Sequence, residues 1–148
     1  MPTARSVAVA VVENKIIYVI GGWNGIFSGP GLATVESYDP ATETWTEESQ
    51  LLVGKWAPSG GLFGTKASGY TIVVPDGAAQ CCPSGFTGDN EAYNASTNAW
   101  TWLTSDPTAR ANHSYCQRTS NHRPAPFRET CRGWGTVYRI AIHVHSRE

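Results

Sequence analysis

Short apolar or alternating segments, separated by polar turns, fill about the first hundred residues of the chain. Residues 16–20 (Ile-Ile-Tyr-Val-Ile) are a continuous apolar run, the pattern of a strand that is buried on both faces. Strands are predicted at residues 6–12, 16–20, 33–38 and 44–47, and again at 60–65, 69–74, 89–93 and 99–103. Because no segment shows a convincing helical period, the pattern predicts an all-β chain made of two four-stranded antiparallel meanders.

The chain also repeats itself. Residues 35–46 return 55 positions later as residues 90–101, with Glu, Tyr, Thr, Trp and Thr in register. Pro2-Thr3-Ala4-Arg5 returns unchanged as Pro107-Thr108-Ala109-Arg110, at an offset of 105. A period near 50 residues indicates a stack of supersecondary units in which each unit packs on its neighbours.

The first unit joins an apolar strand that ends in Gly21-Gly22 to Tyr38 and Trp45, and the second unit carries Tyr93 and Trp100. At these residues the chain resembles the kelch family of β-propellers, to which the central domain of galactose oxidase also belongs. The resemblance covers about residues 1–116. An alignment at an offset of 54 puts Pro75-Asp76 opposite the glycine pair, so the second unit is expected to lack that pair.

The motif residues are interpreted as structural. The glycine pair allows the backbone to leave the second strand without a Cβ clash. Tyr38 and Trp45 are expected to be largely buried, and to hold one blade against the next through large flat contacts. On this interpretation, truncation of Trp45 costs about 3 to 5 kcal/mol.

The predicted fold is therefore an incomplete β-propeller of four-stranded antiparallel kelch blades. Residues 1–54 form the first blade, residues 55–106 a degenerate second blade, and residues 107–148 a partial third repeat followed by a basic, poorly ordered tail. Late strands are considered at residues 111–116 and 136–145. Since propellers typically have four to eight blades, a truncated product or a fragment is expected, and self-association or missing blades would cover the terminal apolar faces.

Charge is unevenly distributed. Residues 1–116 carry five Lys or Arg against ten Asp or Glu, whereas residues 117–148 carry six Arg against two Glu. The overall net charge of −1 argues against a nucleic-acid partner. No window of about 18 apolar residues exists, so no membrane span is expected. A signal peptide is not recognisable, which predicts a cytoplasmic protein if the chain is complete and otherwise leaves the localisation unknown.

Catalytic and metal-binding constellations are sparse. Cys116, His122, Cys131 and His143 could be drawn as a metal site, but no pair has a recognised ligand spacing. The adjacent Cys81 and Cys82 could form a vicinal disulfide or remain two small loop residues. The sequence therefore predicts a protein without a metal, a cofactor or an enzymatic activity.

Function is expected on the longer loops, because in a four-stranded meander the second-to-third connection lies at the same end as the connection between blades. The candidate contact residues combine aromatic and Arg anchors; they are Arg5, Trp23, Asn24, Phe27, Trp56, Phe86 and Arg110. The two arginines could instead satisfy loop carbonyls, and Trp56 could belong to the core. The resemblance implies a non-enzymatic module that binds a protein or peptide. The alternative is a fragment of a propeller that binds or processes carbohydrate.

Overall fold

The computed structural model describes residues 1–26, 29–65, 68–79, 85–109 and 111, and every regular element in these ranges is a β-strand. The first sheet contains β1 (Val9–Glu13), β2 (Ile16–Ile20), β3 (Val35–Asp39) and β4 (Thr44–Glu47). The second sheet contains β5 (Gly61–Thr65), β6 (Gly69–Val74), β7 (Asn90–Asn94) and β8 (Ala99–Leu103). The described residues contain no helix that could span a membrane.

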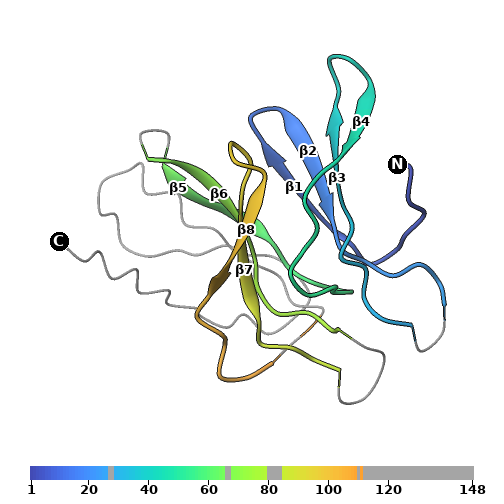
Figure 1. The fold of residues 1–148 in the computed structure, drawn as a ribbon, viewed down its shortest axis with the longest axis vertical. Helices are drawn as coiled ribbons and strands as arrows, with labels where there is room; N and C mark the ends of the chain where they lie inside the picture. Colours follow the sequence, from blue (N-terminus) through green and yellow to red (C-terminus); the bar gives the residue numbers. More distant parts are fainter. Residues whose placement is uncertain (27–28, 66–67, 80–84, 110, 112–148) are drawn as a thin grey trace, which may run out of the picture.

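Each sheet is a simple meander in which consecutive strands pair antiparallel, in the orders β1-β2-β3-β4 and β5-β6-β7-β8 (Figure 1). The two-residue turn between β1 and β2 has positive φ at both Asn14 (49°) and Lys15 (69°), the conformation that matches the twist of a tight hairpin. The prediction of two four-stranded antiparallel blades is confirmed. We call the two sheets the first and second blade.

Strands β2, β3 and β4 pair in the same register as β6, β7 and β8, at an offset of 55. Ile17 pairs with Tyr38, and Tyr38 pairs with Trp45; Ile72 pairs in the same way with Tyr93, and Tyr93 with Trp100. The repeated sequence thus produces the same strand pairing twice.

This register corrects the alignment at an offset of 54, which places Pro75-Asp76 opposite Gly21-Gly22; the second blade does lack a pair of glycines. At an offset of 55, Gly21 and Gly22 (φ 65° and 108°) correspond to Asp76 and Gly77 (φ 51° and 118°). A Cβ at Gly21 would lie 2.5 Å from the Lys55 carbonyl oxygen, and glycine avoids this clash. Asp is among the few other residues that adopt positive φ readily. One glycine and the backbone path are therefore retained.

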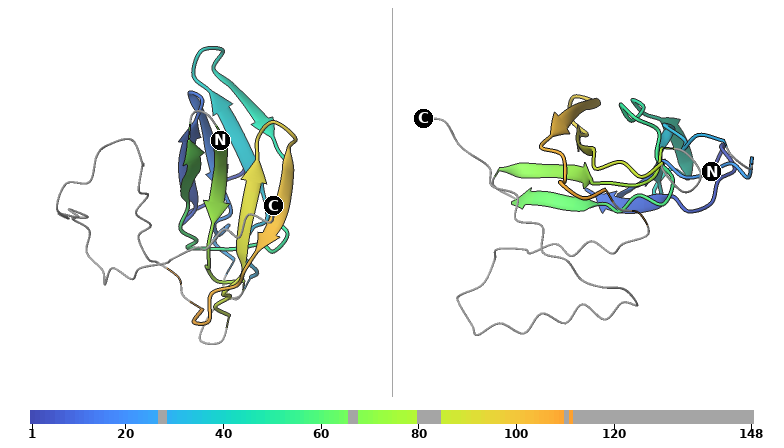
Figure 2. Two further views of the ribbon diagram at one scale, coloured as in Figure 1. Left: turned by 90° about the vertical axis from the view of Figure 1, so that its left-hand side faces the viewer. Right: turned by 90° about the horizontal axis from the view of Figure 1, so that it is seen from below.

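The hydrophobic core lies between the blades, which stand side by side (Figures 1 and 2). Tyr18 of β2 meets Tyr93 of β7 edge to face, with ring centroids 5.7 Å apart. The buried cluster comprises Val11, Tyr18, Ile20, Val35, Leu51, Ile72, Val74, Tyr93 and Trp100. Neither blade could bury these side chains alone.

Tyr38 and Trp45, which the sequence predicts to be largely buried, are less buried than their counterparts in the second blade. Tyr93 and Trp100 are 1% and 9% exposed, whereas Tyr38 and Trp45 are only half-buried. The physical reason is position, because the first blade covers the face of the second that carries Tyr93, while no described sheet covers the corresponding face of the first.

Several expectations lie outside the described residues. They concern the strand at 136–145, all but Ala111 of the strand at 111–116, the basic tail, Cys81 and Cys82, and the contact residues Phe27 and Arg110.

Candidate functional site

The tight turns of both blades gather at one end of the molecule and the longer connections at the other (Figures 1 and 2). We call the second end the loop face; it is formed by residues 21–34, 48–60 and 75–89, apart from those outside the described ranges. The sequence prediction that these three connections share one end is thus met.

Backbone hydrogen bonds tie the loop face together. Ser6 and Trp23 exchange two bonds of 2.9 and 2.8 Å, and Trp56 and Ala78 exchange two of 2.9 and 3.0 Å. The Gly31 N–H donates to the Ala79 carbonyl at 2.9 Å and so links the loops of the two blades. Although these segments are not strands, backbone N–H···O=C hydrogen bonds of the kind found in a sheet hold them in place.

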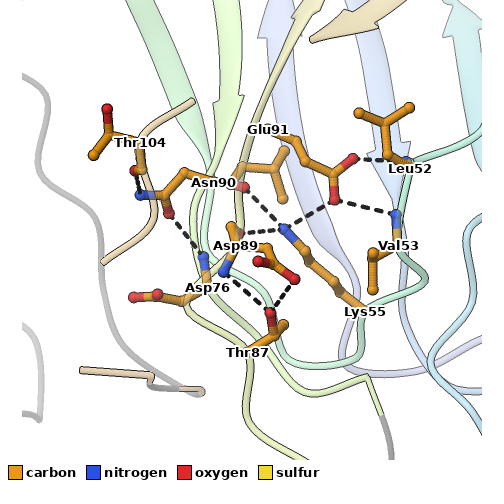
Figure 3. A network of polar contacts seen from close by, with 10 residues as sticks. Leu52, Val53, Lys55, Asp76, Thr87, Asp89, Asn90, Glu91 and Thr104 are labelled. Carbon is orange, nitrogen blue, oxygen red and sulfur yellow. Dashed lines mark hydrogen bonds and ion pairs between the residues drawn. The ribbon is translucent and has the colours of Figure 1, made fainter. Parts of the chain in front are cut away.

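An ion pair lies beneath this surface (Figure 3). The Lys55 ammonium is 3.0 Å from Glu91 Oε1 and donates to the Asp89 carbonyl at 2.6 Å. Both side chains are fully buried. Burial lowers the pKa of Lys55, and the Glu91 carboxylate counteracts part of that effect.

Glu91 also holds the connection between the blades. Its two oxygens accept the N–H groups of Leu52 (2.7 Å) and Val53 (3.3 Å) (Figure 3). The carboxylate therefore fixes the segment that carries Lys55 across the face of the second blade. Removing the carboxylate would leave the buried Lys55 ammonium without its counter-ion and the N–H groups of Leu52 and Val53 without their acceptor.

The first blade contains an equivalent ion pair, from Arg5 to Glu36. Arg5 Nη2 lies 2.8 Å from Glu36 Oε2, and Nη1 donates to the carbonyls of Gly21 (3.0 Å) and Thr34 (2.7 Å). Glu36 Oε1 accepts the backbone N–H of Thr3 at 3.0 Å, as Glu91 accepts that of Leu52. The Arg5 side chain is 0% exposed.

Arg5 is consequently not a contact residue of the loop face. Its guanidinium turns into the blade and satisfies loop carbonyls, which is the alternative that the sequence left open. Sequence reasoning missed the roles of Lys55, Glu36 and Glu91. The available signal was Glu36, which returns as Glu91 within the repeated segment.

A model of the Kelch motif matches residues 4–52, which contain the whole first blade. The chain carries a kelch repeat.

Solved structures agree with this fold. The chain is similar to a fungal alcohol oxidase of the AA5 family determined in complex with copper, with a TM-score of 0.63 and 12% identity over 75% of this chain and 24% of that one. It thus spans about a quarter of that protein's length. At this identity the likeness concerns the fold alone. No curated protein matches the chain.

The first blade presents exposed apolar and polar groups on the loop that follows β2. Ile26 is 62% exposed, and its carbonyl accepts the indole N–H of the half-buried Trp23 at 2.8 Å. The exposed Asn24 accepts the N–H of Ile26 through its side-chain oxygen at 3.2 Å. These hydrogen bonds support the loop from within and leave the Ile26 side chain in solvent.

A second group lies on the loops of the second blade. Ala78 forms bridges with both Trp56 and Phe86, so it lies between these two aromatic residues on one short ladder. Residues paired across a ladder point to the same side. Phe86 is 50% exposed. Trp56 is half-buried and its indole nitrogen is enclosed, which agrees in part with the alternative that Trp56 belongs to the core.

Metal binding finds no support in the described part of the chain, where no three His, Cys, Asp or Glu side chains converge on one point. Ile26 and Phe86, which are apolar, and Asn24, which is polar, are the exposed side chains described above for the loop face.

Proposed function

We propose that this chain is a non-enzymatic kelch-type interaction module that binds a protein or peptide through its loop face. The observation that carries the proposal is the exposure of Ile26 and Phe86 on loops whose backbones are fixed by hydrogen bonds. Apolar side chains on a rigid support bind with little loss of conformational entropy. Interfaces draw most of their binding energy from a few such anchors.

The charge of the loop face indicates the kind of ligand. Of the cations in the described ranges, Arg5 and Lys55 are buried in ion pairs, and Lys15 lies in the β1–β2 turn at the opposite end. None of these three is available to an anionic ligand at the loop face. A peptide with aromatic or aliphatic side chains suits this surface better than a phosphorylated or nucleic-acid ligand.

The second candidate is a fragment of a propeller that binds or processes carbohydrate. It is favoured by Trp23, a partly exposed indole beside the amide of Asn24, and by the likeness of the fold to a copper-containing fungal alcohol oxidase. An aromatic ring next to a polar group is a common way to hold a sugar ring. Because the match covers a quarter of that oxidase, activity is not carried over with the fold.

A selection experiment distinguishes the two. The full chain is immobilised and offered a random peptide library displayed on phage, and in parallel an array of oligosaccharides. We expect peptides to be enriched and their binding to weaken at least tenfold on Phe86→Ala or Ile26→Ala. Val12→Ala, which changes an equally exposed apolar residue (57%) near the turn end, serves as the matched control and should leave binding unchanged. Enrichment on oligosaccharides that depends on Trp23, with no peptide selected, would contradict the proposal.

A further inference from the structure

The loop that follows β2 contains Asn24-Gly25, the one place in the chain where glycine directly follows asparagine. Both residues are exposed. Asparagine is thermally labile in proteins, because the backbone nitrogen of the next residue can attack the side-chain amide and close a five-membered ring. A Cβ on that next residue hinders the attack, and glycine has none. The loop face therefore carries a chemically reactive pair of residues.

The backbone at Asn24 is already bent toward this ring. Asn24 Oδ1 accepts the Ile26 N–H at 3.2 Å, which is the turn in which an asparagine side chain folds back over its own backbone. The Gly25 nitrogen lies between the two hydrogen-bonded groups, on the side to which the Asn24 amide is folded. Gly25 has a φ of 88°, and a Cβ built on it would meet nothing within 4 Å. The turn thus brings the two reacting groups together in open space.

The same hydrogen bond stabilises the charge that the attack creates. When the Gly25 nitrogen attacks, negative charge moves onto Asn24 Oδ1, the oxygen to which the Ile26 N–H already donates. A donor aimed at a developing oxyanion lowers the barrier. The Ile26 carbonyl in turn accepts the Trp23 indole N–H at 2.8 Å and the Gly29 N–H at 2.9 Å. The donor is therefore held in a fixed position.

The second blade contains the same turn without the glycine. Asn94 Oδ1 accepts the Ser96 N–H at 2.9 Å, and Asn94 is exposed. The residue between them is Ala95, which is partly buried and has a Cβ beside the nitrogen that would attack. Asn94 is consequently a control within the same molecule, because it shares the exposure and the hydrogen bond of Asn24 but not the unhindered neighbour.

We propose that Asn24 is a self-modification site, at which the folded protein converts an amide of its loop face to an acid. The Gly25 nitrogen gives its proton to hydroxide and forms a bond to Asn24 Cγ. The bond from Cγ to Nδ2 then breaks, and the nitrogen leaves as ammonia with a proton from water, which regenerates the hydroxide. Water opens the cyclic imide at either carbonyl, and the products are aspartate and isoaspartate.

The effect on binding depends on the product, and this step rests on the proposed function. Aspartate at position 24 keeps an acceptor oxygen for the Ile26 N–H. Isoaspartate adds a methylene to the main chain before Gly25, so the turn that supports Ile26 is lost. A ligand anchored on Ile26 is then released as the protein ages, because the anchor no longer has a rigid support.

Peptide mapping by mass spectrometry tests the chemistry without any ligand. The full chain is kept folded at mildly alkaline pH, and conversion at Asn24 and Asn94 is followed in the same sample. We expect Asn24 to convert at least tenfold faster than Asn94, and no more slowly than in the same chain unfolded in urea. Gly25→Ala should slow conversion at Asn24, and Ala95→Gly should speed conversion at Asn94. Conversion of Asn24 as slow as that of Asn94, or confined to the unfolded chain, would overturn the proposal.

The effect on the loop is measured separately. After conversion, the Trp23 indole N–H, assigned with Trp23→Phe, should exchange faster in NMR spectra, because its Ile26 acceptor has moved. A peptide selected on the fresh chain should bind the aged chain at least tenfold more weakly. Isoaspartate methyltransferase with its methyl donor, which returns isoaspartate to aspartate, should restore both signals, and Asn24→Asp should behave like the fresh chain.

The two proposals fail in different ways. If no peptide is selected, the proposed function is wrong, while the mapping and the Trp23 exchange still decide the chemistry and the loss of the turn. If the converted chain keeps both its peptide affinity and its Trp23 protection, Asn24 conversion does not alter the loop face, and that part of the inference is wrong.

Discussion

The two Tyr–Trp pairs of this chain have the same ring geometry but differ in how far they are buried. The rings of Tyr38 and Trp45 lie 4.9 Å apart at 36°, and those of Tyr93 and Trp100 lie 5.0 Å apart at 37°. Yet the second pair is almost completely buried and the first is not. Cross-strand pairing sets the ring geometry within one blade, whereas burial depends on the neighbouring blade. The kelch motif therefore specifies the form of the contact but not its energetic value.

The largest expected difference between the blades concerns their tryptophans. Trp100→Ala should cost about 3 to 5 kcal/mol of unfolding free energy, the usual range for a buried aromatic residue. Trp45→Ala should cost about 1 to 2 kcal/mol, below what the sequence pattern alone predicts, because part of its ring already meets water. Urea denaturation of both variants measures the difference. Equal losses would show that the first pair is covered in solution.

The buried ion pair of the second blade comes next. Glu91→Gln should cost about 3 kcal/mol, the lower end of the range for breaking a buried pair, because the amide oxygen can still accept one backbone N–H. Replacing both partners, Lys55→Met with Glu91→Met, should recover most of that loss, since no buried charge remains unpaired. Denaturant melts of the single and double variants measure both effects. A double variant as unstable as Glu91→Gln would show that the carboxylate acts chiefly by holding Leu52 and Val53.

The burial of Tyr93 should appear in alkaline solution. Burial, and after it the charge of Glu48, raises the pKa of Tyr93 above its ordinary value of 10.0. The folded state therefore retains this proton when the unfolded state has lost it. The resulting stability is complete below pH 10 and declines as the pH rises further.

Tyr93→Phe should accordingly make the alkaline fall in unfolding free energy shallower by up to about 1.4 kcal/mol per pH unit above pH 10. Lys55, whose pKa burial lowers, acts with the opposite sign as the pH approaches 10.5, but it is present in both proteins and cancels in the difference. Below pH 9 the two proteins should show the same slope, which is the internal control. Parallel slopes throughout would contradict the assignment.

The smallest effect should be the same in both blades. Asp39 Oδ1 accepts the Ala41 N–H at 2.8 Å, and Asn94 Oδ1 accepts the Ser96 N–H at 2.9 Å, each in an exposed turn. Asp39→Ala and Asn94→Ala should each cost about 0.5 to 1.5 kcal/mol, the value of one such hydrogen bond. Denaturant melts should give equal losses, because a turn does not depend on the neighbouring blade. Clearly unequal losses would show that the turns are not independent of the packing.

The strands at residues 16–20, 44–47, 69–74 and 99–103 were predictable to the residue, since apolar periodicity and turn residues are local signals. The half-buried state of Trp45 was not predictable, because it depends on which sheet lies beside the first blade.

The candidate site was predictable in part. That the longer connections share one end follows from the meander, and Trp23, Asn24 and Phe86 do lie there with partly or largely exposed side chains. Arg5 and Lys55 could not be distinguished from surface cations by sequence, because their burial depends on glutamates 31 and 36 positions away. The missed glycine equivalence had a different cause, because the offset of 55 that the repeated segments show places Asp76-Gly77 opposite Gly21-Gly22.

The central claim is that a neighbouring sheet, and not the motif, buries the Tyr–Trp pair. Hydrogen exchange of the indole N–H protons tests it most directly, because the Trp100 indole donates to the Ser49 carbonyl at 2.8 Å whereas Trp45 is half-buried. The two signals are assigned with Trp45→Phe and Trp100→Phe. We predict that the Trp100 proton exchanges only when the blades separate, and that the Trp45 proton exchanges at least a hundredfold faster. Equal protection of the two protons would contradict the claim.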